Sequence, residues 1–301
     1  MRHRILKHRL LLFLPMLLLL NPLISNAQRT DVFAKRNLVA WCVVPFDAKK
    51  RGPQERAKML HDVGIKKLAY DWREEHIPTF DLELQALNTY NIKLEAFWMM
   101  SDKNPEGNAH IEAIFDFLER NKVKTQIWLL MGEWEGFVGL SQSGKVQAMT
   151  IPIRYIAERA TKIGCEVALY NHGGWFGEPE NQLEIIEHLN LKNVGIVYNF
   201  HHARLHHERF PTFFPKIKPH LMALNIAGLK TGVTDRFFRV GQGDVEQEMI
   251  RLVWKSGYQG TIGIINHDMD EDAAVGLQTE LDGLKRILSE IGDTKALKTY
   301  P

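Results

Sequence analysis

Two neighbouring apolar segments of the chain each lead into imidazole and amide side chains. The first segment is followed by His172 and a pair of glycines. The second is followed by Asn199 and then by two adjacent histidines, His201 and His202. A neutral imidazole can accept or donate a proton near neutral pH. We therefore expect His172 and His202 to be catalytic, as base, acid or oxyanion stabiliser, and the second segment's asparagine and other histidine to bind the substrate.

Three further parts of the chain offer groups for the same chemistry. Glu133, between a glycine and a tryptophan, is a candidate catalytic acid or base, provided that strand alternation turns it inward. Asp71 and Arg73 flank a tryptophan and either bind the hydroxyls of a substrate or brace a loop as an ion pair. Gln242 and His267 follow later apolar segments, where they are expected to contact the substrate and close the pocket.

Eight short apolar segments rich in β-branched residues alternate with segments of helical periodicity. Such alternation indicates a parallel sheet with right-handed crossovers. Eight repeats in a chain of this length predict a single (β/α)8 barrel, the TIM barrel fold, with its chemistry at the carboxyl ends of the strands. The competing architecture, an open doubly wound sheet, would need a glycine-rich phosphate turn where the chain has Val44-Pro45-Phe46-Asp47. The expected strands are Leu38–Pro45, Lys67–Trp72, Lys93–Met99, Thr125–Met131, Glu166–His172, Asn193–Asn199, Leu221–Asn225 and Thr261–Asn266, and the shortest expected helix is Ala203–Phe210.

Residues 1–27 are typical of a secretory signal peptide. A basic start, an apolar run over Leu10–Leu20 and a small-residue cleavage site at Ser25-Asn26-Ala27 follow one another there. The apolar run is short for a membrane span, so we expect an exported protein, periplasmic or secreted, with no stable membrane anchor after cleavage. Residues 28–301 are then expected to form one barrel domain.

Charge and cysteine content exclude several kinds of partner and site. Four of the 38 Lys and Arg residues and none of the 36 Asp and Glu residues lie in the first 27 positions, which leaves a formal charge of −2 on the remainder. No basic stripe interleaved with aromatic residues follows, so nucleic acid is not an expected partner. Cys42 and Cys165 fall on opposite sides of the expected barrel without metal-binding spacing, so neither a disulfide nor a zinc pair is expected.

Three motifs at the strand ends occur in one order along the chain. They are Asn171-His172-Gly173-Gly174, the segment Val194–His202 and the turn Gly241-Gln242-Gly243-Asp244. In this order they resemble the xylose-isomerase-like TIM barrel superfamily of sugar isomerases and ketose 3-epimerases, over essentially all of residues 28–301. The resemblance implies a small carbohydrate substrate. It also implies one divalent metal ion, held by a Glu, an Asp, a His and a Glu on strands five to eight.

The metal site implied by the resemblance is divergent in this chain. The corresponding positions carry Tyr170, Asn199, Asn225 and either Ile265 or Asn266. None of these is anionic, whereas carboxylates normally hold the ion in an oxygen-rich site. Two alternatives remain open: a shifted set of ligands holds one Mn, Co, Ni or Zn ion, or the barrel works without metal through a carboxylate and a histidine. The shifted set would be Glu133, His172, His202 and His267.

Together these features predict an exported carbohydrate-active enzyme that removes a proton next to the carbonyl of a keto-sugar. The outcome would be isomerisation, epimerisation, or elimination and hydration, because the carbonyl makes the neighbouring C–H acidic enough for a side-chain base. The alternative is a non-catalytic carbohydrate-binding barrel, suggested by tryptophans at several strand ends. A glycoside hydrolase would need two carboxylates facing across the sugar, for which Glu133 and Asp71 are the candidates. The sequence predicts no particular oligomeric state.

Overall fold

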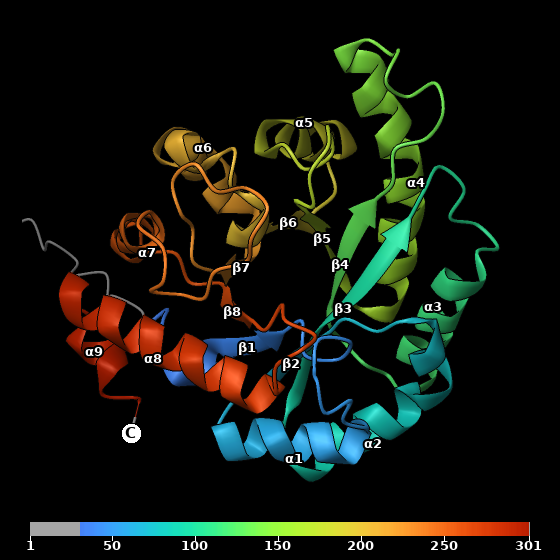
Figure 1. The fold of residues 1–301 in the computed structure, drawn as a ribbon. Helices are drawn as coiled ribbons and strands as arrows, with labels where there is room; N and C mark the ends of the chain where they lie inside the picture. The colour runs from blue at the N-terminus through green and yellow to red at the C-terminus, as the bar shows by residue number, and fades with distance from the viewer. Residues whose placement is uncertain (1–30, 301) are drawn as a thin grey trace, which may run out of the picture.

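The computed structural model describes residues 31–300, which form a closed barrel of eight parallel strands surrounded by helices (Figure 1). Each strand pairs with its neighbour in the sequence, and the pairing of β1 with β8 closes the barrel. The predicted (β/α)8 fold is therefore confirmed. The strands are β1 Leu38–Trp41, β2 Lys67–Tyr70, β3 Lys93–Ser101, β4 Gln126–Met131, β5 Glu166–Tyr170, β6 Val194–Asn199, β7 Leu221–Ile226 and β8 Thr261–Ile265.

Helices follow the strands and cover the outside of the barrel. Several begin and end at residues that satisfy the free backbone groups of a helix terminus. Asn108 caps the first turn of α3 with its side chain, and Gly164 ends α4 in a left-handed conformation. None of the described helices is long and apolar enough to cross a membrane. The α-helices are α1 Pro53–Val63, α2 Phe80–Thr89, α3 Ala109–Arg120, α4 Gln142–Ile163, α5 Pro179–Leu189, α6 Phe210–Ile217, α7 Glu246–Lys255, α8 Ala273–Ile291 and α9 Thr294–Leu297.

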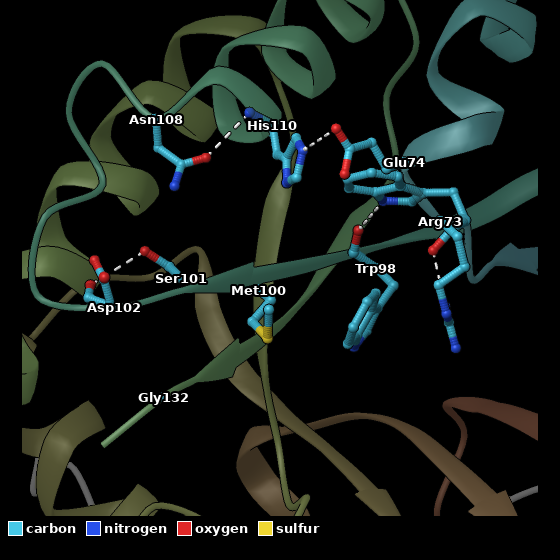
Figure 2. Close-up of a pocket in the computed structure, with 10 residues that line it drawn as sticks. Arg73, Glu74, Trp98, Met100, Ser101, Asp102, Asn108, His110 and Gly132 are labelled. Atoms are coloured by element: carbon cyan, nitrogen blue, oxygen red, sulfur yellow. Dashed lines mark hydrogen bonds and ion pairs between the residues drawn. The ribbon is translucent and has the colours of Figure 1, made fainter. Parts of the chain in front are cut away.

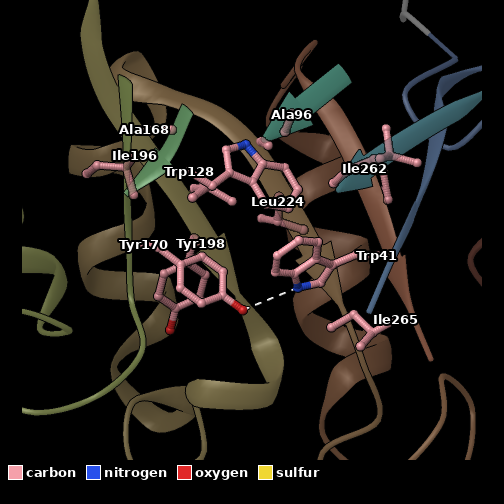
Figure 3. Close-up of a cluster of buried hydrophobic side chains, with 14 of the residues drawn as sticks. Trp41, Ala96, Trp128, Ala168, Tyr170, Ile196, Tyr198, Leu224, Ile262 and Ile265 are labelled. Carbon is pink, nitrogen blue, oxygen red and sulfur yellow. Dashed lines mark hydrogen bonds between the residues drawn. The ribbon is translucent and has the colours of Figure 1, made fainter. Parts of the chain in front are cut away.

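Aromatic side chains fill the interior of the barrel beneath its mouth (Figure 3). The indole of Trp41 from β1 meets that of Trp128 from β4 edge to face, with ring centroids 4.9 Å apart. Its Nε1–H donates to the hydroxyl of Tyr170 from β5 at 3.3 Å. Strands on opposite sides of the barrel are thus joined by one packed layer, which gives the groups above it a rigid floor.

Several strands end earlier than the apolar runs suggest. The first strand stops at Trp41, because Cys42 adopts a positive φ of 56° that strand pairing cannot continue. The fifth stops at Tyr170, two residues before its expected end, whereas the fourth stops at Met131 as expected, and the polar residues that follow both strands lie on loops. As a result, alternation along the strand does not decide where those polar side chains point.

The expected helix Ala203–Phe210 is wrong. Residues 203–209 form turns and a short 3₁₀ segment, and the helix begins only at Phe210. Pro211 stands in its first turn, where a fixed φ and a missing N–H are favourable, which explains the late start. Cys42 and Cys165 are buried and free, as expected. The predicted signal peptide, residues 1–27, lies outside the described residues.

Candidate active site

A cavity of about 270 Å³ opens at the carboxyl ends of the strands. Its walls come from β1 to β6 and from the loop after β8, so seven of the eight strands contribute. Six of the nine residues expected from the sequence to act on substrate line this cavity. They are Asp71, Arg73, His172, Asn199, His202 and His267.

Four imidazole rings lie in contact at one side of the cavity. The ring of His172 lies 4.2 Å from that of His202, centroid to centroid. His202 contacts His201 at 4.8 Å, and His201 contacts His267 at 4.6 Å. His201 stands behind the others, outside the cavity lining, and its Nδ1 lies 2.9 Å from the guanidinium of Arg204. Residues 200–202 form a 3₁₀ turn, so both adjacent histidines reach the cluster, which strand alternation would not allow.

The surroundings keep these histidines neutral. Desolvation lowers the pKa of His172, His202 and His267 below the ordinary imidazole value. Desolvation and the neighbouring His267 and Arg204 lower the pKa of His201 to about 3. After desolvation, repulsion from the charged forms of His172, His201 and His267 also lowers the pKa of His202, so the cluster is suited to accept a single proton.

The pKa of Asp71 is shifted in the opposite direction, upward. Its side chain is 2% exposed, and desolvation raises its pKa to about 7 against the pull of Arg73. One oxygen, Oδ1, accepts the backbone N–H of Val44 at 3.2 Å, and Oδ2 is buried with no hydrogen-bond partner in the described part of the chain. The cavity thus pairs a carboxyl that retains its proton near neutral pH with imidazoles that lose theirs, the arrangement needed for an acid and a base.

Arg73 is fixed across the cavity from two directions. Its Nη1 donates to the backbone carbonyls of Asp71 and Trp72, both at 2.8 Å. Its guanidinium lies over the rings of Trp98 and Phe46, at 5.4 and 5.8 Å from their centroids. The side chain therefore braces the loop after β2 through backbone carbonyls, in place of the expected ion pair with Asp71, and it also presents a cation to the cavity.

Asn199 is engaged within the protein, although it lines the cavity. Its Nδ2 donates to the hydroxyl of Tyr170 at 2.6 Å, and its Oδ1 accepts the backbone N–H of His201 at 2.9 Å. The side chain of Asn171 joins the same region by bonding both backbone groups of Asn199. These bonds fix the start of the turn that carries His202, and both polar groups of the Asn199 side chain are engaged within the protein.

Glu133 and Gln242 do not line this cavity. Glu133 does not line the cavity, and its Oε1 accepts the backbone N–H of Trp175 at 2.7 Å. The expected inward orientation is wrong because Glu133 lies on a loop, two residues after the end of β4 at Met131, where strand alternation no longer applies. Gln242 is exposed, and its Oε1 accepts the backbone N–H of Arg239 at 3.1 Å within a turn. Asp71 is then the sole carboxylate that lines the cavity, which argues against the two-carboxylate geometry of a glycoside hydrolase.

Replacing Glu133 by glutamine should have little effect on turnover. The amide oxygen can still accept the N–H of Trp175, so we expect kcat/KM within about threefold of the wild-type value, whereas a catalytic acid or base contributes about 100-fold or more. Steady-state kinetics of the two proteins test this. A loss of about 100-fold would return Glu133 to the catalytic set.

Sequence reasoning missed the contribution of the first strand to the cavity. Cys42 and Phe46 line it, and the ring of Phe46 stacks on His267 with centroids 4.2 Å apart. An aromatic in the turn Val44-Pro45-Phe46-Asp47 was the available signal, because that turn follows a strand at its carboxyl end. The left-handed conformation of Cys42, in contrast, leaves no trace in the sequence.

The residues at the expected metal positions do not fit a divalent ion. The hydroxyl of Tyr170 receives hydrogen bonds from Trp41 and Asn199. Asn225 packs over Gly263, and the amide of Asn266 binds Arg239 and the carbonyl of Phe46. Within residues 31–300, no three His, Cys, Asp or Glu side chains converge as ligands, so the shifted set proposed from the sequence does not gather either.

Solved structures with the same fold are known, at low sequence identity. A D-tagatose 3-epimerase-like protein aligns with a TM-score of 0.65 and 16% identity, over 85% of this chain and 98% of that one. The IolI protein with a bound zinc atom aligns with a TM-score of 0.64 and 15% identity, over 85% and 99%. The 3-keto-D-glucoside 4-epimerase YcjR from E. coli, in its apo form, aligns with a TM-score of 0.62 and 14% identity, over 85% and 100%.

No curated protein sequence matches the chain. A family model does, and it covers most of the barrel, from the start of α1 into α8. The match spans residues 54–287, so the chain belongs to the xylose isomerase-like TIM barrel family.

Proposed function

We propose that this protein is an exported enzyme that removes a proton next to the carbonyl of a keto-sugar, leading to epimerisation, isomerisation or elimination. One observation carries the proposal: the cavity at the strand ends brings together the buried carboxyl of Asp71, whose pKa is raised to about 7, and the imidazoles of His172 and His202, whose pKa values are lowered by burial. Export is supported by the signal-like sequence of residues 1–27. The name of one similar structure, a 3-keto-D-glucoside 4-epimerase, describes inversion at a carbon beside a carbonyl.

The proposed steps follow from the protonation states. His172 takes the proton, because its pKa is lowered less than that of His202 and its exposed edge allows exchange with solvent. The electron pair of the broken C–H bond becomes the C=C bond of an enol, while Asp71 gives its proton to the carbonyl oxygen. In epimerisation, the enol returns its O–H proton to Asp71 as the carbonyl re-forms, the carbon takes a proton from water on its opposite face, and His172 releases its proton to solvent. In elimination, the enol O–H proton also returns to Asp71, the enol electrons form the new C=C bond to the next carbon, and the leaving group departs from that carbon with the proton held by His172.

The charges around the cavity favour a neutral sugar. Arg73 is the one Lys or Arg side chain among its lining residues, and two of its hydrogen bonds go to backbone carbonyls. A phosphorylated sugar normally needs several free donors, such as backbone N–H groups at a helix start or a cluster of cations. The aromatic walls formed by Trp41, Phe46 and Trp98 suit the apolar faces of a pyranose ring.

Proton exchange tests the proposal directly. In deuterated buffer, the protein should replace the hydrogen next to the carbonyl of a keto-glucoside at least about 100-fold faster than buffer alone, as followed by proton NMR. The parent glucoside, which lacks the carbonyl, is the matched control and should not exchange. If keto-glycosides bind without exchange or conversion, the protein is instead a carbohydrate-binding barrel, the alternative raised by its strand-end tryptophans.

A further inference from the structure

A second cavity, of about 490 Å³, lies next to the first at the ends of β2, β3 and β4 (Figure 2). The two cavities share one wall, formed by Arg73, Trp98 and Met100. In Figure 2 the indole of Trp98 lies between Met100 and the guanidinium of Arg73. The two cavities are therefore adjacent, with Trp98 lining both.

Hydrogen bonds of Trp72 and Asn108 help to set the shape of the second cavity. Trp72 is buried and donates its Nε1–H to the backbone carbonyl of Trp98 at 2.7 Å, which fixes the base of the shared wall. Its ring meets that of His110 edge to face, with centroids 5.4 Å apart. Asn108 caps α3 and thereby holds His110 at the start of that helix, on the far side of the cavity. The cavity is thus built before any ligand arrives.

Its lining combines an apolar platform with balanced polar groups. Trp98 and Met100 occupy alternate positions of β3, and Met100, which is 57% exposed, lines both cavities. Around them stand Glu74 and Asp102, whose two carboxylates offset the single guanidinium of the shared wall. This balance disfavours an anionic ligand, whereas aromatic faces beside carboxylate and amide groups suit the apolar face and hydroxyls of a sugar ring.

We infer that the substrate is a disaccharide-like glycoside, with its keto-sugar ring in the first cavity and a second, uncharged sugar ring in the second. The first cavity, at about 270 Å³, lies below the volumes of about 300–1,000 Å³ typical of sites for larger ligands, so it holds one ring. The inference rests on the proposed function for the chemistry of that first ring. The second ring adds binding contacts at Trp98 and His110, remote from the reacting carbon.

Gly132 offers a way to block the second cavity without disturbing the first. It lines the second cavity alone, and a Cβ added there would lie 3.6 Å from the carbonyl oxygen of Ser101, an ordinary contact. Its φ is not positive, so leucine can adopt the same backbone. Gly132→Leu therefore fills the cavity, and His110→Ala removes one wall. Lys103→Ala, on the exposed loop between β3 and α3, is the control.

The test compares a disaccharide with the matching methyl glycoside, first by calorimetric binding and then, as keto derivatives, by turnover. We expect the wild-type protein and Lys103→Ala to bind the disaccharide at least about tenfold more tightly, and Gly132→Leu and His110→Ala to lose that preference. Affinity for the methyl glycoside should stay within about twofold in every variant that keeps the wild-type melting temperature.

Each result separates the two proposals. Equal affinity of the wild-type protein for both sugars, or a preference that survives both blocking substitutions, overturns the second subsite. A preference that disappears in Gly132→Leu and His110→Ala supports it even if no keto derivative is turned over, and in that case the proposed reaction fails alone. If one blocking variant does not fold, the other gives the same answer, because the two substitutions lie on different elements.

Discussion

Replacing Asp71 by asparagine is expected to abolish the fall in kcat/KM on the alkaline side of neutrality. Burial raises the pKa of the Asp71 carboxyl to about 7, so the wild-type protein loses its acid as the pH rises above that value. Activity should then drop about tenfold for each further pH unit. The amide of asparagine still offers an N–H to the carbonyl oxygen and does not titrate, so the profile of the variant stays flat from about pH 6 to about pH 9.

Alanine at the same position gives the matched comparison. Asp71→Ala has no donor at all, and we expect a loss of about 100-fold or more in kcat/KM at every pH between about 5 and about 9. Profiles of the two variants and the wild-type protein, measured on one keto-glycoside, decide the role. An alkaline limb that persists in Asp71→Asn would assign that limb to another group and return Asp71 to substrate binding.

Asp71→Asn should also change how the free energy of unfolding depends on pH. The folded-state pKa of Asp71 lies above its ordinary value of 3.8, so the folded protein holds the proton more tightly than the unfolded chain. The free energy of unfolding therefore falls as the pH rises from about 4 to about 7, and the fall levels off at about 4 kcal/mol. This figure follows because each pKa unit between the folded and unfolded states corresponds to about 1.4 kcal/mol. Asp71→Asn removes this loss, so its advantage over the wild-type protein in the free energy of unfolding should be greater at about pH 8 than at about pH 5. Urea unfolding at the two pH values measures the difference.

The sequence was sufficient to predict the barrel because its signals are repeated eight times. Every predicted strand overlaps an observed one. The competing open sheet is disfavoured because the turn after the first strand lacks the glycines of a phosphate-binding turn. The errors occur where a run of apolar residues continues beyond the hydrogen-bonded strand, as at Cys42, or where prolines delay a helix, as in α6. Periodicity measures which residues are buried, and burial extends past the point where pairing stops.

The site was predicted less completely, for the same reason. His172, His202 and His267 follow directly on strand ends, and the closed barrel brings them to one cavity. Glu133 follows a strand end equally well, but its loop turns the carboxylate to the backbone of Trp175. The proximity of His201 to His202 depends on a 3₁₀ turn, and the raised pKa of Asp71 depends on burial from several strands, neither of which local sequence reports.

Removing either of two imidazoles should reduce turnover by at least about 100-fold. His172 is the proposed base and His202 its neighbour at 4.2 Å, and positioned acid–base groups contribute about 100- to 10,000-fold. His172→Gln keeps a polar side chain of similar length without a base of useful pKa, so it should lose proton exchange while retaining affinity for the glycoside. Losses below about tenfold in both His172→Ala and His202→Ala would reject their catalytic assignment.

The pH dependence distinguishes a base from a structural neighbour. Repulsion from His172 is one of the causes that lower the pKa of His202, after desolvation, so removing His172 should raise the pKa of His202. NMR of labelled histidine would show this rise, and His172→Ala should acquire an acidic limb in its residual activity at a higher pH than the wild-type protein. The double variant should lose no more than the stronger single variant, because two rings that share one proton act as a unit. If the loss of activity in the double variant equals the product of the two single losses, the two imidazoles act in separate steps.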